Sequence, residues 1–139
     1  MSHRFGTEAW ATALVSEING SSEYRNAAAK WGDGFNGNVL LVFHADAALP
    51  ENHALLVELC KGACQGAAFV PGGSDSRAGF GLRAPFSVWR DVLSRKTLAA
   101  TAILTGKMKI DGDKMTLLKH TAAHRALVSC AAAIDTEFE

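Results

Sequence analysis

The sequence predicts an α+β fold, with a five-stranded mixed, mainly antiparallel sheet covered by about five helices. Stretches with the 3.6-residue apolar spacing of helices stand at both ends of the chain. Between them lie short apolar or alternating stretches separated by Gly and Pro, a pattern that is typical of strands. The length of 139 residues suits one domain, so we expect a single domain over residues 1–139.

Two helices are expected before the sheet. The first begins after Thr7, whose side chain suits an N-cap, and ends at Gly20. Its apolar stripe consists of Trp10, Leu14 and Ile18. The second spans residues 21–30, with Tyr24 and Trp31 on one face. Large aromatic side chains that face inward are more often core residues than ligand contacts, so we expect these aromatic residues in the core.

Four strands are expected in the middle of the chain, after a glycine-rich loop over residues 32–37. This loop follows a helix and precedes a strand, the reverse of the order in a phosphate-binding loop, so a nucleotide site is disfavoured. The strands cover residues 39–45, 53–61, 64–70 and 77–83. One side of the fourth strand carries Ala78, Phe80 and Leu82. The other side carries Gly79 and Gly81, which indicates that either a helix or a ligand approaches it closely.

Two helices and a fifth strand follow. Pro85 suits the first turn of the third helix, where its missing N–H costs nothing. The side chains that this helix is expected to turn inward are Phe86, Trp89 or Val88, Val92 and Leu93. The fourth helix covers residues 97–104, and the fifth strand covers residues 107–110. In that strand Met108 and Ile110 face one way and the lysines face the other.

The terminal helix is expected to run unbroken over residues 114–136, because this stretch has no Gly or Pro. Asp113 is a good N-cap for it. One face is formed by Met115, Leu118, Ala122, Ala126, Cys130 and Ala133. Such thin side chains either let the helix pack tightly on the sheet or leave room for a ligand, and the sequence is compatible with both.

Residues capable of catalysis or metal binding do not form a convincing set. His120 and His124 have the i, i+4 spacing that can hold a metal, but Thr121 stands where a zinc protease has its glutamate. We therefore expect solvated surface histidines. Cys60 and Cys64 lack further ligands at a fixed spacing, so free thiols are expected. The sequence also lacks the G-x-S-x-G motif of a nucleophilic serine. It therefore predicts no enzyme, no metal site and no cofactor.

Composition limits the partners and the location. Fourteen Lys and Arg residues balance fourteen Asp and Glu residues, which argues against nucleic-acid binding. No stretch is apolar for long enough to cross a membrane, and the N-terminus lacks a signal-peptide core. Three cysteines argue against a disulfide framework. These features predict a cytoplasmic location.

The segment GKMKIDGD, residues 106–113, follows a short apolar helix and precedes the terminal helix. This arrangement resembles the sterol carrier protein 2 family, and Leu98, Ala102 and Leu104 fit the helix of that family. The order of the expected elements matches as well. The resemblance implies a bacterial-type stand-alone member: a five-stranded sheet covered by helices, with an apolar tunnel for a sterol, fatty acid, acyl chain or isoprenoid lipid and no catalytic residues.

Non-catalytic binding and carriage of a hydrophobic ligand is the function that this resemblance implies, with the tunnel expected between sheet and helices. The predicted ligand-binding residues are Phe80, Leu82, Phe86, Trp89, Leu93, Ile103, Met108, Met115 and Leu118. The same side chains could instead simply fill the core. An alternative function is a structural or accessory interaction module, dimeric and without a bound lipid. The expected partner is a hydrophobic small molecule or lipid, with transient membrane contact and a homodimer as further possibilities.

Overall fold

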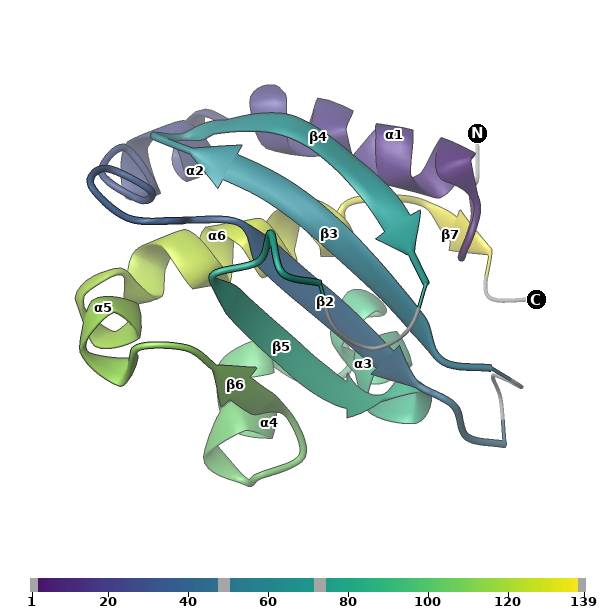
Figure 1. Ribbon diagram of the computed structural model, residues 1–139. Helices are drawn as coiled ribbons and strands as arrows, with labels where there is room; N and C mark the ends of the chain where they lie inside the picture. Colours follow the sequence, from purple (N-terminus) through teal and green to yellow (C-terminus); the bar gives the residue numbers. More distant parts are fainter. Residues whose placement is uncertain (1–2, 48–50, 72–74, 138–139) are drawn as a thin grey trace.

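The computed structural model describes residues 3–47, 51–71 and 75–137, whose arrangement is shown in Figure 1. The strands are β1 (His3–Arg4), β2 (Val39–His44), β3 (His53–Cys60), β4 (Ala63–Val70), β5 (Phe80–Pro85), β6 (Lys109–Asp111) and β7 (Thr136–Glu137). The helices are α1 (Glu8–Asn19), α2 (Ser22–Ala27), α3 (Phe86–Leu93), α4 (Ala99–Leu104), α5 (Lys114–Lys119) and α6 (Thr121–Ala132). Residues 72–74, expected in a loop, and Pro50, expected in a turn, lie outside the described residues.

The main sheet has five strands in the order β4-β3-β2-β5-β6. Strands β2 and β5 are parallel, with Val39 opposite Phe80, and the other neighbouring strands are antiparallel. The predicted α+β class and the mixed, mainly antiparallel sheet are therefore confirmed. Strands β1 and β7 form a second, parallel pair, with His3 opposite Thr136. Sequence patterns did not predict this pair, because strands of two residues carry no periodicity.

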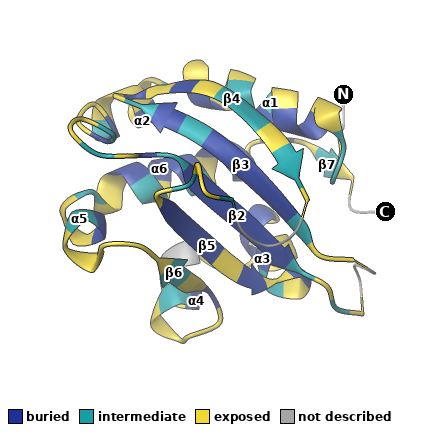
Figure 2. Ribbon diagram, in the orientation of Figure 1, coloured by how far each residue is buried: buried dark blue, intermediate teal, exposed yellow. Residues whose placement is uncertain are grey.

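Alternation along the strands gives the sheet two apolar faces. In β2, Val39, Leu41 and Phe43 belong to the main core, whereas Leu40 and Val42 belong to a second cluster on the opposite face. Figure 1 shows α1, α3 and α6 on one side of the sheet, and Figure 2 shows the central strands buried along most of their length. Burial of both faces explains why β2 is continuously apolar.

The N-terminal helices pack on the main core as predicted. Thr7 caps α1, because its Oγ1 accepts a hydrogen bond from the backbone N–H of Trp10 at 3.3 Å. The indole N–H of Trp10 donates to Oγ1 of Thr136 at 2.9 Å and ties β7 to α1. Trp10 and Trp31 are both fully buried, which confirms their predicted place in the core. Helix α2 ends at Ala27 and not at residue 30.

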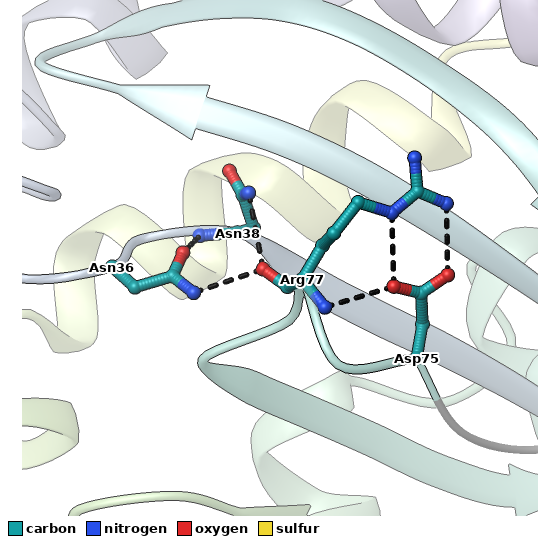
Figure 3. A network of polar contacts seen from close by, with 4 residues as sticks. All are labelled: Asn36, Asn38, Asp75 and Arg77. Atoms are coloured by element: carbon teal, nitrogen blue, oxygen red, sulfur yellow. Dashed lines mark hydrogen bonds and ion pairs between the residues drawn. The ribbon is translucent and has the colours of Figure 1, made fainter.

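A polar network holds the connection between β4 and β5 against the loop that precedes β2 (Figure 3). The side-chain amides of Asn36 and Asn38 donate to the carbonyl oxygen of Arg77 at 2.8 and 3.2 Å. The Arg77 guanidinium donates to both carboxylate oxygens of Asp75, at 3.0 and 2.8 Å. These hydrogen bonds lower the pKa of Asp75 to about 2. The network therefore fixes the turn that leads into β5.

Strand β5 begins later than the sequence predicted. Ala78 precedes the strand and packs on the second cluster, on the opposite face from Phe80. The prediction that these two side chains share one side is wrong, because the chain turns before it enters the sheet. Gly79 marks this turn: a Cβ there would clash with the backbone of Asn36. The close neighbour of the glycine is thus a loop, neither the helix nor the ligand that was expected.

The prediction of one unbroken terminal helix is wrong. His120 has φ −120° and ψ 32°, outside the helical region, and separates α5 from α6. The described residues consequently form six helices where about five were expected. The break changes which side chains face inward: Met115, Leu118, Ala122 and Ala133 are exposed. The buried residues of α6 are Ala123, Ala126, Leu127, Cys130 and Ala131.

Candidate ligand-binding site

The nine residues predicted to contact a ligand fall into two groups. Six are buried together in the main core, namely Phe80, Leu82, Phe86, Trp89, Leu93 and Met108. Ile103 is half-buried and packs against them. Met115 and Leu118 are exposed, so the prediction that they face the sheet is wrong. That prediction placed them on the inward face of one continuous helix, whereas the helix is interrupted at His120. A role of these residues in ligand binding stays a prediction.

Trp89 anchors the buried group. Its indole N–H donates to the carbonyl oxygen of Val42 at 2.8 Å, and the centre of its ring lies 4.7 Å from that of Phe43. The indole is thereby both packed and hydrogen-bonded, as a buried tryptophan requires. The ring of Phe80 lies so close to Gly112 that a Cβ there would clash with it. These contacts fix the positions of the core side chains.

A groove of about 400 Å³ lies between α6 and the segment that joins α3 to α4. We call it the α3–α6 groove. It is lined by Val92, Arg95, Thr97, Leu98, Thr121, Arg125, Val128, Ser129 and Ala132. The α6 residues recur at helical spacing and therefore form one wall, and residues 92–98 form the other. A volume of this size is within the range of small-molecule sites.

The α3–α6 groove combines an apolar interior with two positive charges. Val92 is buried and Val128 half-buried, whereas Arg95 and Arg125 are exposed. Within the described part of the chain, neither arginine takes part in an ion pair. Guanidinium groups bind carboxylates and phosphates through charge-assisted hydrogen bonds. The groove therefore suits an amphiphile, with its apolar part inside and an anionic group toward the arginines.

None of the groove residues is among the nine predicted from the sequence. Arg125 belongs to the polar side of its helix, and Arg95 follows the end of α3, so both have the pattern of ordinary surface arginines. A signal exists at positions 121, 125, 128 and 132, which share one helical face and mix polar with apolar side chains. This pattern indicates a groove only when the segment that joins α3 to α4 is known to lie opposite this face of α6.

Two histidines lie against Trp31, namely His124 of α6 and His120 directly before this helix. Nε2 of His124 is buried and has no hydrogen-bond partner among the described residues. The ring centres of His124 and Trp31 are 4.7 Å apart, and those of His120 and Trp31 are 5.4 Å apart. Burial and, secondarily, the charge of His120 lower the pKa of His124 to about 4. The prediction that both histidines are solvated is wrong, since both are half-buried.

The cysteines are free thiols, as predicted. Cys64 and Cys130 are buried and Cys60 is half-buried. Burial raises the pKa of the Cys64 thiol above its ordinary value. In residues 3–47, 51–71 and 75–137, no group of three His, Cys, Asp or Glu side chains is placed to hold a metal ion. Over the same residues, no helix is long and apolar enough to span a membrane.

A comparison with protein families decides which family this fold represents. The model of the SCP-2 sterol transfer family matches residues 19–124, which is most of the chain. The chain belongs to the SCP-2 sterol transfer family. Membership agrees with the resemblance of residues 106–113 to sterol carrier protein 2, and it connects the protein to a family of lipid binding and transfer.

Solved structures of SCP-2 proteins share this fold. A crystal structure of sterol carrier protein 2 is 30% identical, with a TM-score of 0.81, and the match covers 92% of this chain and 97% of that chain. A solution structure from Thermus thermophilus, of a conserved hypothetical protein described as possibly sterol carrier protein, is 29% identical, with a TM-score of 0.81 and coverage of 99% and 94%. Sterol carrier protein 2 from Yarrowia lipolytica, in its apo form, shares the fold alone at 16% identity, with a TM-score of 0.55 and coverage of 88% of both chains. A search of curated proteins found no match.

Proposed function

We propose that the protein binds and carries a lipid in the α3–α6 groove, without catalysing a reaction. The observation that carries the proposal is the groove itself, a space of about 400 Å³ with an apolar interior and two arginines free of ion pairs with described residues. Membership of a sterol transfer family supports the ligand class. The proposed ligand is an acyl or isoprenoid lipid whose anionic group lies against Arg95 and Arg125.

The energetics favour an apolar ligand at this place. Contact with Val92, Leu98 and Val128 removes apolar surface of the lipid from water. Burial of roughly 300 Å² gains about 7 kcal/mol before the costs of immobilising the ligand. The arginines are exposed, so their contribution is smaller and serves mainly to orient the anionic end. Burial of the apolar chain therefore supplies most of the affinity in this proposal.

The core residues predicted from the sequence form a second contact surface in the proposal. Leu93 follows Val92 directly in α3, and Ile103 lies on α4, which begins directly after the groove residue Leu98. A lipid chain longer than the groove contacts these residues when α4 moves away from the core. Helix α4 has six residues, so packing and not its own hydrogen bonds holds it in place.

A titration with a fluorescent fatty acid on the delipidated protein tests this proposal. Ala132→Trp places a large ring in the groove and should weaken binding by about tenfold or more. Ala122→Trp is the matched control, because Ala122 is exposed on the same helix and outside the groove lining. Circular dichroism checks that both variants fold. Equal binding by the two variants would contradict the groove as the binding site. If the wild type bound no fatty acid, sterol or isoprenoid lipid, the proposed function itself would be contradicted.

A further inference from the structure

Exposed apolar side chains gather in one part of the chain. Among the described residues, the exposed large hydrophobic side chains are Leu98 (73% exposed), Leu104 (86%), Met115 (64%) and Leu118 (72%). They belong to α4, to α5 and to the residue before α4. Figure 1 shows α4, β6 and α5 together at the β6 edge of the sheet, at the lower left. We call residues 98–119 the basic edge, for the charges described next.

Positive charge gathers in the same stretch, although the whole chain has a formal net charge of zero. Residues 98–119 contain four lysines, Lys107, Lys109, Lys114 and Lys119, and three further basic residues flank them within residues 95–125, namely Arg95, Lys96 and Arg125. They contain two acidic residues, Asp111 and Asp113. Half of the fourteen basic residues of the chain therefore lie within residues 95–125, in the basic edge or beside it, with only two of the fourteen acidic residues.

Both acidic residues of the basic edge already have partners. Asp111 accepts hydrogen bonds from the Arg83 guanidinium, at 2.6 and 3.1 Å. Asp113 caps α5, because its carboxylate accepts from the backbone N–H of Met115 and from the hydroxyl of Thr116. The lysines of the basic edge form no ion pair within the described part of the chain. Their charge is therefore available to an anionic partner.

A hollow of about 300 Å³ adjoins the turn between α4 and β6. Lys107 and Lys109 line it together with His44 and with Arg83, whose guanidinium is bound to Asp111. Leu104, the most exposed of the apolar side chains, ends α4 just before this turn. The turn thus presents an apolar side chain beside a basic hollow, and α5 repeats the combination with Met115 and Leu118 between Lys114 and Lys119.

We propose that the basic edge docks onto the surface of an anionic lipid bilayer. Leu104, Met115 and Leu118 enter the interface between headgroups and acyl chains, and the lysines contact lipid phosphates. A protein partner fits this surface less well, because lysine is depleted from protein interfaces, whereas apolar residues beside lysines are typical of segments that lie on membranes. Leu98 belongs both to the basic edge and to the α3–α6 groove, so docking brings the mouth of the groove to the lipid surface.

Co-sedimentation with vesicles tests this docking. The wild type should bind vesicles of equal parts phosphatidylcholine and phosphatidylglycerol, and binding should weaken with added salt and on pure phosphatidylcholine. Lys107→Gln/Lys109→Gln should lower the partition coefficient about 25-fold, about fivefold for each lysine. Arg4→Gln/Lys61→Gln is the matched control, because it removes two exposed positive charges outside the basic edge and should leave binding unchanged.

Two further variants separate docking from lipid binding in the groove and from dimer formation. Leu104→Ser/Leu118→Ser should weaken vesicle binding by about tenfold or more, with an unchanged thermal melt because both side chains are exposed. Ala132→Trp should still bind vesicles, so a failure of the lipid groove is distinguishable from a failure of docking. Equal binding to neutral vesicles, an equal loss in the Arg4/Lys61 control, or a dimer that Leu104→Ser/Leu118→Ser dissociates would overturn the proposal.

Discussion

Protonation of His124 is expected to destabilise the protein as the pH falls below neutrality. Its Nε2 is buried without a hydrogen-bond partner among the described residues, and its ring packs on Trp31. Burial lowers the pKa of His124 from 6.5 to about 4, so the folded state binds this proton less tightly than the unfolded state. Stability is therefore complete above pH 6.5 and is lost as the pH falls toward 4. At about 1.4 kcal/mol per pH unit, the loss from this residue is about 2 kcal/mol at about pH 5.

Urea unfolding at about pH 8 and about pH 5, followed by tryptophan fluorescence, measures this loss. His124→Phe keeps an aromatic ring against Trp31 but removes the titrating group, so its free energy of unfolding should fall by about 2 kcal/mol less than that of the wild type. His3→Gln, at the other end of the chain, should behave as the wild type does. An equal loss of stability in the wild type and in His124→Phe between the two pH values would contradict the predicted role of His124.

Two further predictions concern the turn into α5. Gly112 has φ +124° and its Cα faces the ring of Phe80, so Gly112→Ala should cost about 2–4 kcal/mol in urea unfolding. Gly34→Ala, at φ +83° in open space, should cost about 1 kcal/mol, and equal losses would argue against the clash. Asp113→Ala should cost about 1 kcal/mol by removing the cap on the N–H of Met115, whereas Asp113→Asn should retain most of the stability. Similar melting temperatures for these two Asp113 variants would show that the cap contributes little.

Local signals predicted the elements whose structure depends on neighbouring residues. The continuous apolar run of β2 indicated a strand covered on both faces, and the structure places Leu40 and Leu41 in clusters on opposite faces. Thr7 and Asp113 were predicted as N-caps, and both side chains accept the expected backbone N–H. Met108 was predicted to face inward from residues 107–110 and is buried. Alternation and capping are short-range effects, which explains their success.

Tertiary contacts decided the elements that local signals predicted wrongly. Nothing in the sequence near His120 marks a helix end, since neither Gly nor Pro occurs there. The break coincides with the packing of His120 and His124 on Trp31, a residue far away in the chain. The α3–α6 groove was missed for the same reason, because Arg95 and Arg125 come together only once α3 and α6 are packed. Sites built from two distant segments leave no local pattern in either.

The position of a bound lipid is the most direct test of the account, and amide chemical shifts can give it. A fatty acid titrated into isotopically labelled protein should shift the backbone amides of residues 92–98 and of α6, with Arg95 and Val128 among the largest changes. The same titration on Ala132→Trp should leave these amides nearly unmoved. Shifts confined to the opposite face of the sheet, around Leu40 and Gly81, would contradict binding in the α3–α6 groove.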